Sequence, residues 1–137
     1  MESLRRQIEK QVHSLTGASL GVLDLDQPRG DAGLFGPESM VWEVHADFTA
    51  MMVGGISALL LQMLHPLALA GVWDHSTFRQ DMLGRLRRTS LFIAGTTYGG
   101  LHDAEQLIDK VRRIHLQVVG HAPDGRPYAA SDPELLT

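Results

Sequence analysis

Cysteine is absent from this chain of 137 residues, which excludes disulfides, thiolate metal ligands and cysteine nucleophiles. Several catalytic motifs are missing too. The sequence contains no glycine-rich phosphate loop followed by Lys-Ser or Lys-Thr, no G-x-S-x-G elbow and no H-E-x-x-H pair. Its seven histidines show no i,i+4 spacing, so a structural zinc site is not expected.

An excess of basic residues is also missing. The formal net charge is −4, which gives no reason to expect nucleic acid as a partner. The segment MESLRRQIEKQVHSL is too polar for a secretory signal, and Glu2 and Glu9 argue against a transit peptide. The default expectation is a cytoplasmic protein of a bacterium-like cell. The length and the hydrophobic content of 44% are those of one globular domain.

The run from Phe48 to Trp73 contains no Asp, Glu, Lys or Arg. It is long enough to cross a membrane or to anchor the protein at a membrane surface. A helix that is apolar on nearly all sides can equally be the central helix of a soluble all-α domain. His65 and Pro66 inside the run, and the lack of a basic cluster at its ends, favour this buried central helix. Pro66 predicts a long helix, a break at His65-Pro66 and a short second helix through Val72.

Periodicity and capping signals predict helices on both sides of the run. An amphipathic helix is expected at residues 2–15, followed by a loop or arm at 16–36 with a brief extended piece at 20–25. Pro37 is expected to begin a helix that leads into the central run. A helix at 77–94 would be capped by Asp74 or Ser76. A helix at 103–119 would begin with a capping box of Asp103 and Gln106 and stop at Gly120.

No sheet is evident in the sequence. The predicted fold class is therefore all-α, a helical bundle built around a long central apolar helix. Residues 1–36 are expected to form an N-terminal helix and loop arm, and residues 37–137 the helical domain.

Arg85 and Thr89 lie on the stripe of the 77–94 helix that is expected to face the core. At about 100° per residue, this stripe contains Phe78, Met82, Arg85, Thr89, Phe92 and Thr96. Arg85 either snorkels at the edge of the stripe, paired with a carboxylate elsewhere, or is a buried guanidinium that holds an anionic ligand. In the second case the Thr89 hydroxyl adds a polar group on the same face.

His115 lies near the centre of the apolar face of the 103–119 helix, while Lys110 and Arg113 point the other way. A single histidine on such a face is either a core residue hydrogen-bonded to a neighbour or a ligand. An imidazole in an apolar pocket is also typical of an axial haem ligand.

The C-terminal part carries two strong local signals. Pro123-Asp124-Gly125 predicts a turn, and Ser131-Asp132-Pro133-Glu134 is a capping box with proline in the first turn. The helix that this box announces is cut short at Thr137. We therefore expect residues 37–137 to be the front portion of a longer domain, whose missing segment or partner chain covers the central helix.

Arg85-x-x-x-Thr89 and Arg-Arg-Ile-His115 together resemble the DUF2236 group, the family of the oxygenase MpaB and the latex-clearing protein, a rubber oxygenase. The other matching pieces, in the family's order, are LLLQMLHP (59–66), AGV (70–72), RLRRTSLFIAGTTYG (85–99), VRRIHLQVVG (111–120) and GRPYAASDPELLT (125–137). The resemblance covers about residues 37–137, the front half of that family's domain.

The resemblance implies a globin-like helical core that binds haem b. His115 would be the axial iron ligand, and Arg85 and Thr89 would be catalytic residues of the haem pocket. Arg88 would stand where a basic distal residue occurs. The carboxylate proposed as catalytic in rubber oxygenases has no clear match, because Leu69 and its neighbours occupy the region. This counts against rubber cleavage.

Three functions are compatible with the sequence. The first is a haem-b-dependent oxygenase that acts on a hydrophobic small molecule with O₂. The alternative is a haem-free helical module that binds an apolar or carboxylated small molecule through Arg85. The third is a membrane-associated protein that uses Phe48–Trp73. His65 either joins the cofactor pocket on its distal side or is a core histidine that satisfies backbone groups freed by Pro66.

Overall fold

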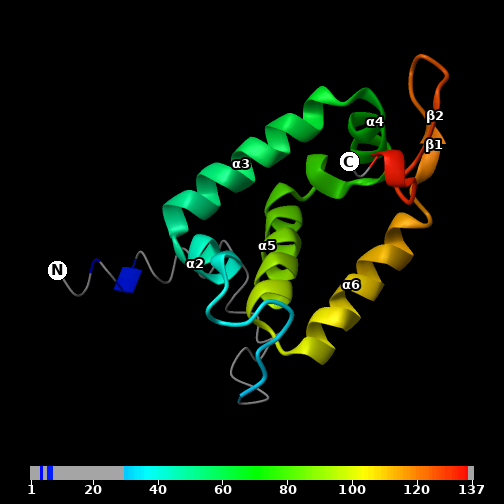
Figure 1. Ribbon diagram of the computed structural model, residues 1–137. Helices are drawn as coiled ribbons and strands as arrows, with labels where there is room; N and C mark the ends of the chain where they lie inside the picture. Colours follow the sequence, from blue (N-terminus) through cyan, green and yellow to red (C-terminus); the bar gives the residue numbers. More distant parts are fainter. Residues whose placement is uncertain (1–3, 5, 8–29, 136–137) are drawn as a thin grey trace. The chain divides into compact units, whose positions relative to one another are not determined.

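The computed structural model describes residues 4, 6, 7 and 30–135 and is mostly helical (Figure 1). Its elements are α2 (Met40–Ala46), α3 (Phe48–Leu64), α4 (Pro66–His75), η2 (Thr77–Arg79), α5 (Met82–Tyr98), α6 (Leu101–His115), β1 (Val119–His121), β2 (Pro127–Ala129) and η3 (Pro133–Leu135). The predicted all-α class is confirmed. The helix expected at 2–15 lies outside the described residues apart from 4, 6 and 7, and so does the extended piece at 20–25.

The chain divides into two compact units. The first unit comprises residues 1–37 and 77–107, and the second unit comprises residues 38–76 and 108–137. The first therefore holds η2, α5 and the beginning of α6. The second holds α2, α3, α4, the end of α6, both strands and η3.

Side-chain caps define α2 and α3 in the second unit. The first helix begins at Met40 rather than at Pro37, because the Ser39 hydroxyl accepts a hydrogen bond from the Trp42 amide. This helix does not run on into the central stretch. Asp47 separates the two helices, and its Oδ1 accepts hydrogen bonds from the Thr49 and Ala50 amides at 2.9 and 3.0 Å at the start of α3.

The predicted break at His65-Pro66 is confirmed. Helix α3 ends at Leu64, and α4 begins at Pro66, which occupies the first helical position. His65 lies between them with extended backbone angles, since the residue before a proline avoids the helical region. Helix α4 continues to His75, three residues beyond the predicted end.

The burial expected for the charge-free run is found only at its C-terminal end, where Ala70 and Gly71 of α4 are buried, and not along the described side chains of α3. The exposed large side chains of α3 are Met52, Val53, Ile56, Leu59, Leu60, Leu61, Met63 and Leu64. The elements of the second unit that α3 contacts most are α2 and α4, which continue it along the chain rather than cover it. Covering by another segment or a partner chain stays a prediction.

None of the described helices is by itself long and apolar enough to span a membrane. Together, α2 and α3 satisfy the criteria of length and composition, but they meet at a bend of 94°.

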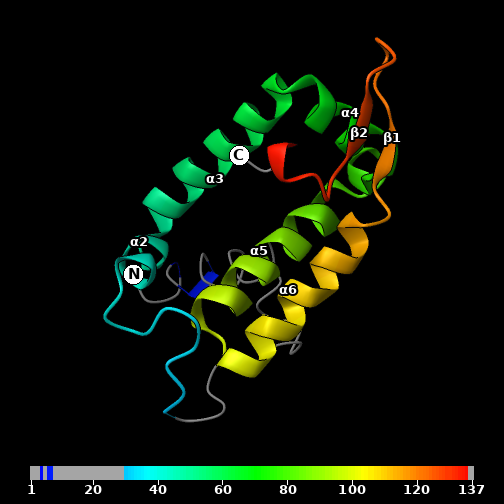
Figure 2. The ribbon, with the colours of Figure 1, turned by 45° about the vertical axis from the view of Figure 1, so that its right-hand side comes forward.

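The core of the second unit lies between α4 and a β-hairpin. Strands β1 and β2 pair antiparallel, with Gly120 opposite Tyr128. The predicted turn at 123–125 is confirmed as the hairpin turn, where Gly125 has a φ of 84°. It projects away from α4 in both views (Figures 1 and 2). The expectation of no sheet was wrong, because residues 118–121 pair across the hairpin instead of continuing a helix to Val119.

Tyr128 is the largest side chain in that core. It is 5% exposed and packs with Ala70 of α4 and with Ala122 of the hairpin. The partly buried residues around this cluster are Leu67, Val118 and Leu135. Tyr128 therefore contributes the largest buried side chain to the contact between the hairpin and α4.

In the first unit, the helix expected at 77–94 is split. Residues 77–79 form the single turn η2, and α5 begins at Met82 after its N-cap Asp81, not after Asp74 or Ser76.

Helix α6 begins at Leu101, ahead of the predicted Asp103 cap. The Leu101 amide donates to Oδ2 of Asp31 at 3.0 Å, so a residue far away in the sequence, before α2, satisfies the helix start.

Candidate functional site

His115 is the last residue of α6. Its side chain is half-buried, and among the described residues no group forms a hydrogen bond with the imidazole. Ile108 and Val111, on the same face, are partly buried as well, while Lys110 and Arg113 on the opposite face are exposed. The side chain thus lies on the partly buried face of α6, and within the described residues no hydrogen bond occupies either ring nitrogen.

Arg85 lies on the first half of α5. Its guanidinium carbon is 5.9 Å from the centroid of the Phe78 ring, a cation–π contact. Within the described part of the chain, the guanidinium forms no ion pair or hydrogen bond. Within the described residues, its five N–H donors are therefore open to a carboxylate or phosphate.

Thr89 is exposed one turn after Arg85. Its hydroxyl donates to the Arg85 carbonyl oxygen at 3.1 Å. Because one hydrogen bond to the preceding turn uses the only donor of the hydroxyl, Thr89 can offer a ligand an acceptor but no donor in this rotamer.

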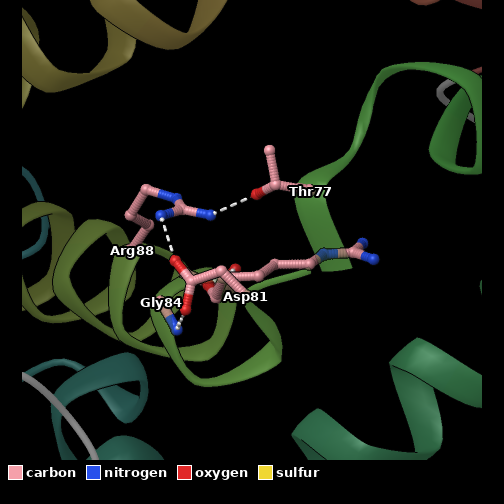
Figure 3. A network of polar contacts seen from close by, with 6 residues as sticks. Thr77, Asp81, Gly84 and Arg88 are labelled. Atoms are coloured by element: carbon pink, nitrogen blue, oxygen red, sulfur yellow. Dashed lines mark hydrogen bonds and ion pairs between the residues drawn. The ribbon is translucent and has the colours of Figure 1, made fainter. Parts of the chain in front are cut away.

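Arg88 belongs to a polar network at the start of α5 (Figure 3). Its Nη1 is 3.3 Å from Oδ2 of Asp81, and its Nη2 donates to the Thr77 hydroxyl at 2.9 Å. The other oxygen of Asp81 accepts from the Gly84 amide at 2.8 Å. One carboxylate therefore caps α5 and neutralises Arg88. Both side chains of the ion pair are more than half exposed, so the pair adds little stability.

Gly84 leaves the space that the Asp81 carboxylate occupies. A Cβ at position 84 would overlap all three carboxyl atoms. Alanine normally stabilises a helix interior by about 1 kcal/mol over glycine. We expect Gly84→Ala instead to lower the free energy of unfolding by about 1 kcal/mol, because it displaces the cap. Urea denaturation measures this. Gly55→Ala in α3, where a Cβ meets nothing within 4 Å, is the control expected to be stabilising.

His65 caps α4. Its Nδ1 accepts a hydrogen bond from the Ala68 amide at 3.3 Å, which replaces a backbone acceptor at the start of the helix. A neutral ring that accepts at Nδ1 carries its proton on Nε2. His65 therefore satisfies a backbone amide beside Pro66 as expected, but it is exposed and is not a core histidine. Its Nε2–H is available as a donor, and a pocket role stays a prediction.

A polar cluster that the sequence analysis missed joins α4 to the hairpin. The Tyr128 hydroxyl donates to Oδ2 of Asp74 at 2.7 Å, and Nε2 of His75 is 3.2 Å from the carbonyl oxygen of Val119. The rings of His75 and Tyr128 meet edge to face at 6.1 Å. Burial, and then the Asp74 carboxylate, raise the pKa of Tyr128 to about 12. The sequence did contain a pattern that could have predicted the hairpin, namely a P-D-G turn between Val-Gly-His-Ala and Arg-Pro-Tyr-Ala.

The predicted site residues are distributed over both units. Arg85, Arg88 and Thr89 belong to the first unit, and His65 and His115 to the second. That His115 and Arg85 serve one pocket stays a prediction.

The donor set of the described residues bears on which metal group could bind. These residues include no cluster of three or more His, Cys, Asp or Glu side chains that could hold a metal ion. A haem requires less from the protein, because the porphyrin supplies four nitrogen ligands and one imidazole completes the axial position. The unengaged imidazole of His115 fits that requirement.

The sequence of residues 42–137 matches the family described as ER-bound oxygenase mpaB/B'/Rubber oxygenase, catalytic domain. The chain belongs to this family. The match covers more than half of the chain and includes α3 to α6 and the hairpin, so the predicted resemblance is confirmed. No curated protein and no solved structure is significantly similar to the chain. The oxygenase character of the family supports the oxygenase-like part of the predicted function.

Proposed function

We propose that the chain is a haem-b-dependent, oxygenase-like protein that acts on a hydrophobic small molecule with O₂, with His115 as the axial iron ligand. The observation that carries the proposal is the half-buried imidazole of His115, which no group in the described residues engages. The family of the chain is an oxygenase catalytic domain. Bound haem would supply the iron at which O₂ is activated.

The residues of this chain would hold and orient the haem. His115 would present a neutral imidazole nitrogen to the iron. Arg85, held against Phe78, would bind a propionate through its planar fork of N–H donors. Thr89 would offer an acceptor one turn further on, and His65 a donor at Nε2. Arg88 would contribute less charge, because Asp81 already neutralises it.

The proposal is tested by adding haemin to the full chain and to His115→Ala, and by recording the Soret band. We expect a His-ligated spectrum for the wild type and its loss in His115→Ala. His121→Ala is the matched control, because His121 is an exposed histidine of β1 in the same unit. An identical spectrum in wild type and His115→Ala would refute His115 as the ligand.

A haem-free binding module is the second candidate. The guanidinium of Arg85 favours it, since this group forms no ion pair within the described residues and its fork can bind the carboxylate of an organic acid without any cofactor. Native mass spectrometry of the purified chain separates the two functions. A bound organic acid that is lost in Arg85→Ala, together with no haemin uptake, would support the module instead.

A further inference from the structure

The chain directly after His115 is held tightly. The Val118 amide donates to the His115 carbonyl oxygen at 3.1 Å, and the Leu116 and Gln117 amides donate back into the last turn of α6. Only three residues separate His115 from β1. A short, hydrogen-bonded connection therefore links the hairpin to the turn that carries the imidazole.

The hairpin itself is fixed to α4 at three points. Val118 packs on the cluster around Ala70, and the Val119 carbonyl oxygen meets Nε2 of His75. The third point is the hydrogen bond from Tyr128 to Asp74. This is the best-defined of the three, because it is short, its donor is buried, and its acceptor is a carboxylate.

A series of contacts thus leads from Asp74 and Tyr128, through the hairpin and residues 116–118, to His115. We propose that Asp74 and Tyr128 are positioning residues for His115: their hydrogen bond holds the hairpin on α4 and so fixes the direction of the imidazole at the end of α6. This inference rests on the proposed function, in which that imidazole is the haem ligand. All four parts, namely α4, the hairpin, the connecting turn and His115, belong to the second unit.

Haemin titrations of the full chain test the inference. Tyr128→Phe and Asp74→Ala each remove the hydrogen bond and are expected to weaken haemin binding about tenfold. This is the lower end of the loss in metal affinity that is usual when a residue orienting a metal ligand is replaced. Their electron paramagnetic resonance spectra should show a smaller fraction of His-ligated iron. Asp74→Asn keeps an acceptor oxygen for Tyr128 and is expected to restore wild-type affinity.

The matched control lies at the tip of the same hairpin. Asp124 accepts hydrogen bonds from the Arg126 amide and from its Nε, at 3.1 and 2.8 Å, and both residues are exposed. Asp124→Ala therefore removes a polar pair of the hairpin away from α4. It is expected to leave haemin affinity unchanged, and circular dichroism verifies that each variant is folded.

A second measurement separates this inference from the proposed function. In the chain without haemin, nitrogen-15 NMR signals of the His115 ring should be sharp in wild type and broadened in Tyr128→Phe. If wild type binds no haemin, the proposed function fails, and these signals alone decide the positioning. Unchanged ring signals and unchanged haemin affinity in Tyr128→Phe and Asp74→Ala would overturn the inference. Equal weakening by Asp124→Ala would also overturn it.

Discussion

Replacing Tyr128 by alanine is expected to lower the free energy of unfolding by about 3–5 kcal/mol, the range for deleting a buried aromatic side chain. The ring is the largest member of the cluster between α4 and the hairpin, and its neighbours Ala70 and Ala122 are too small to fill the space. A typical domain is stable by only about 5–15 kcal/mol, so the hairpin should detach from α4. Urea denaturation followed by circular dichroism measures the loss.

Tyr128→Phe is the control for this prediction. It keeps the ring and removes only the hydrogen bond to Asp74, so it should cost about 1–2 kcal/mol. A loss in Tyr128→Ala no larger than that in Tyr128→Phe would contradict the packing role of the ring.

The pH dependence gives an independent check on Tyr128. Its pKa rises from an ordinary 10.0 to about 12 in the folded chain. Between these values the folded state keeps a proton that the unfolded state releases, so stability falls as pH rises. The contribution of protonated Tyr128 to the free energy of unfolding is complete below pH 10 and is lost as the pH passes through about 12. Tyr128→Phe should show a smaller fall in stability over this range.

Gly120→Ala is expected to lower the free energy of unfolding by about 1–3 kcal/mol, the usual cost of overpacking. Gly120 lies directly opposite Tyr128 in the hairpin, and a Cβ there would overlap the phenol oxygen and lie 2.6 Å from Cζ. A shift of the ring away from position 120 would also move the hydroxyl that donates to Asp74. Thermal unfolding of the variant measures the effect.

Gly71→Ala is the matched control on the other side of the same ring. A Cβ at Gly71 would lie 3.5 Å from Cε2 of Tyr128 and 3.7 Å from Cγ1 of Val118, which are ordinary van der Waals contacts. Since Gly71 is inside α4, alanine should stabilise the chain by up to about 1 kcal/mol. Similar effects of both substitutions would contradict the packing described for Tyr128.

The sequence predicted those parts of the fold and site that depend on near neighbours in the chain. Pro66 determined the break between α3 and α4, because a proline acts on the residue before it and on the helix in which it lies. The apolar face around His115 was found from helical periodicity, and the resemblance pieces were sufficient to identify the family. These signals extend over only a few residues each.

The errors arose where a distant group competes with a local signal. Asp103 and Gln106 looked like a capping box, yet Asp31, seventy residues before Leu101, caps α6. Thr77 looked like a helix start, yet Asp81 caps α5 with the help of the space at Gly84. A capping signal read from sequence identifies suitable side chains and cannot tell which one reaches the free amides.

By itself the sequence determined the helical class, the charge-free α3, the break at Pro66 and membership of an oxygenase family. Only the tertiary structure decided that Val119–His121 pairs with Pro127–Ala129 and that Tyr128 reaches Asp74, 54 residues away. The physical reason is that helix breaks and faces depend on torsions and spacing within a few residues. A buried hydroxyl can bond any carboxylate that packing brings to it, and packing is a property of the folded chain.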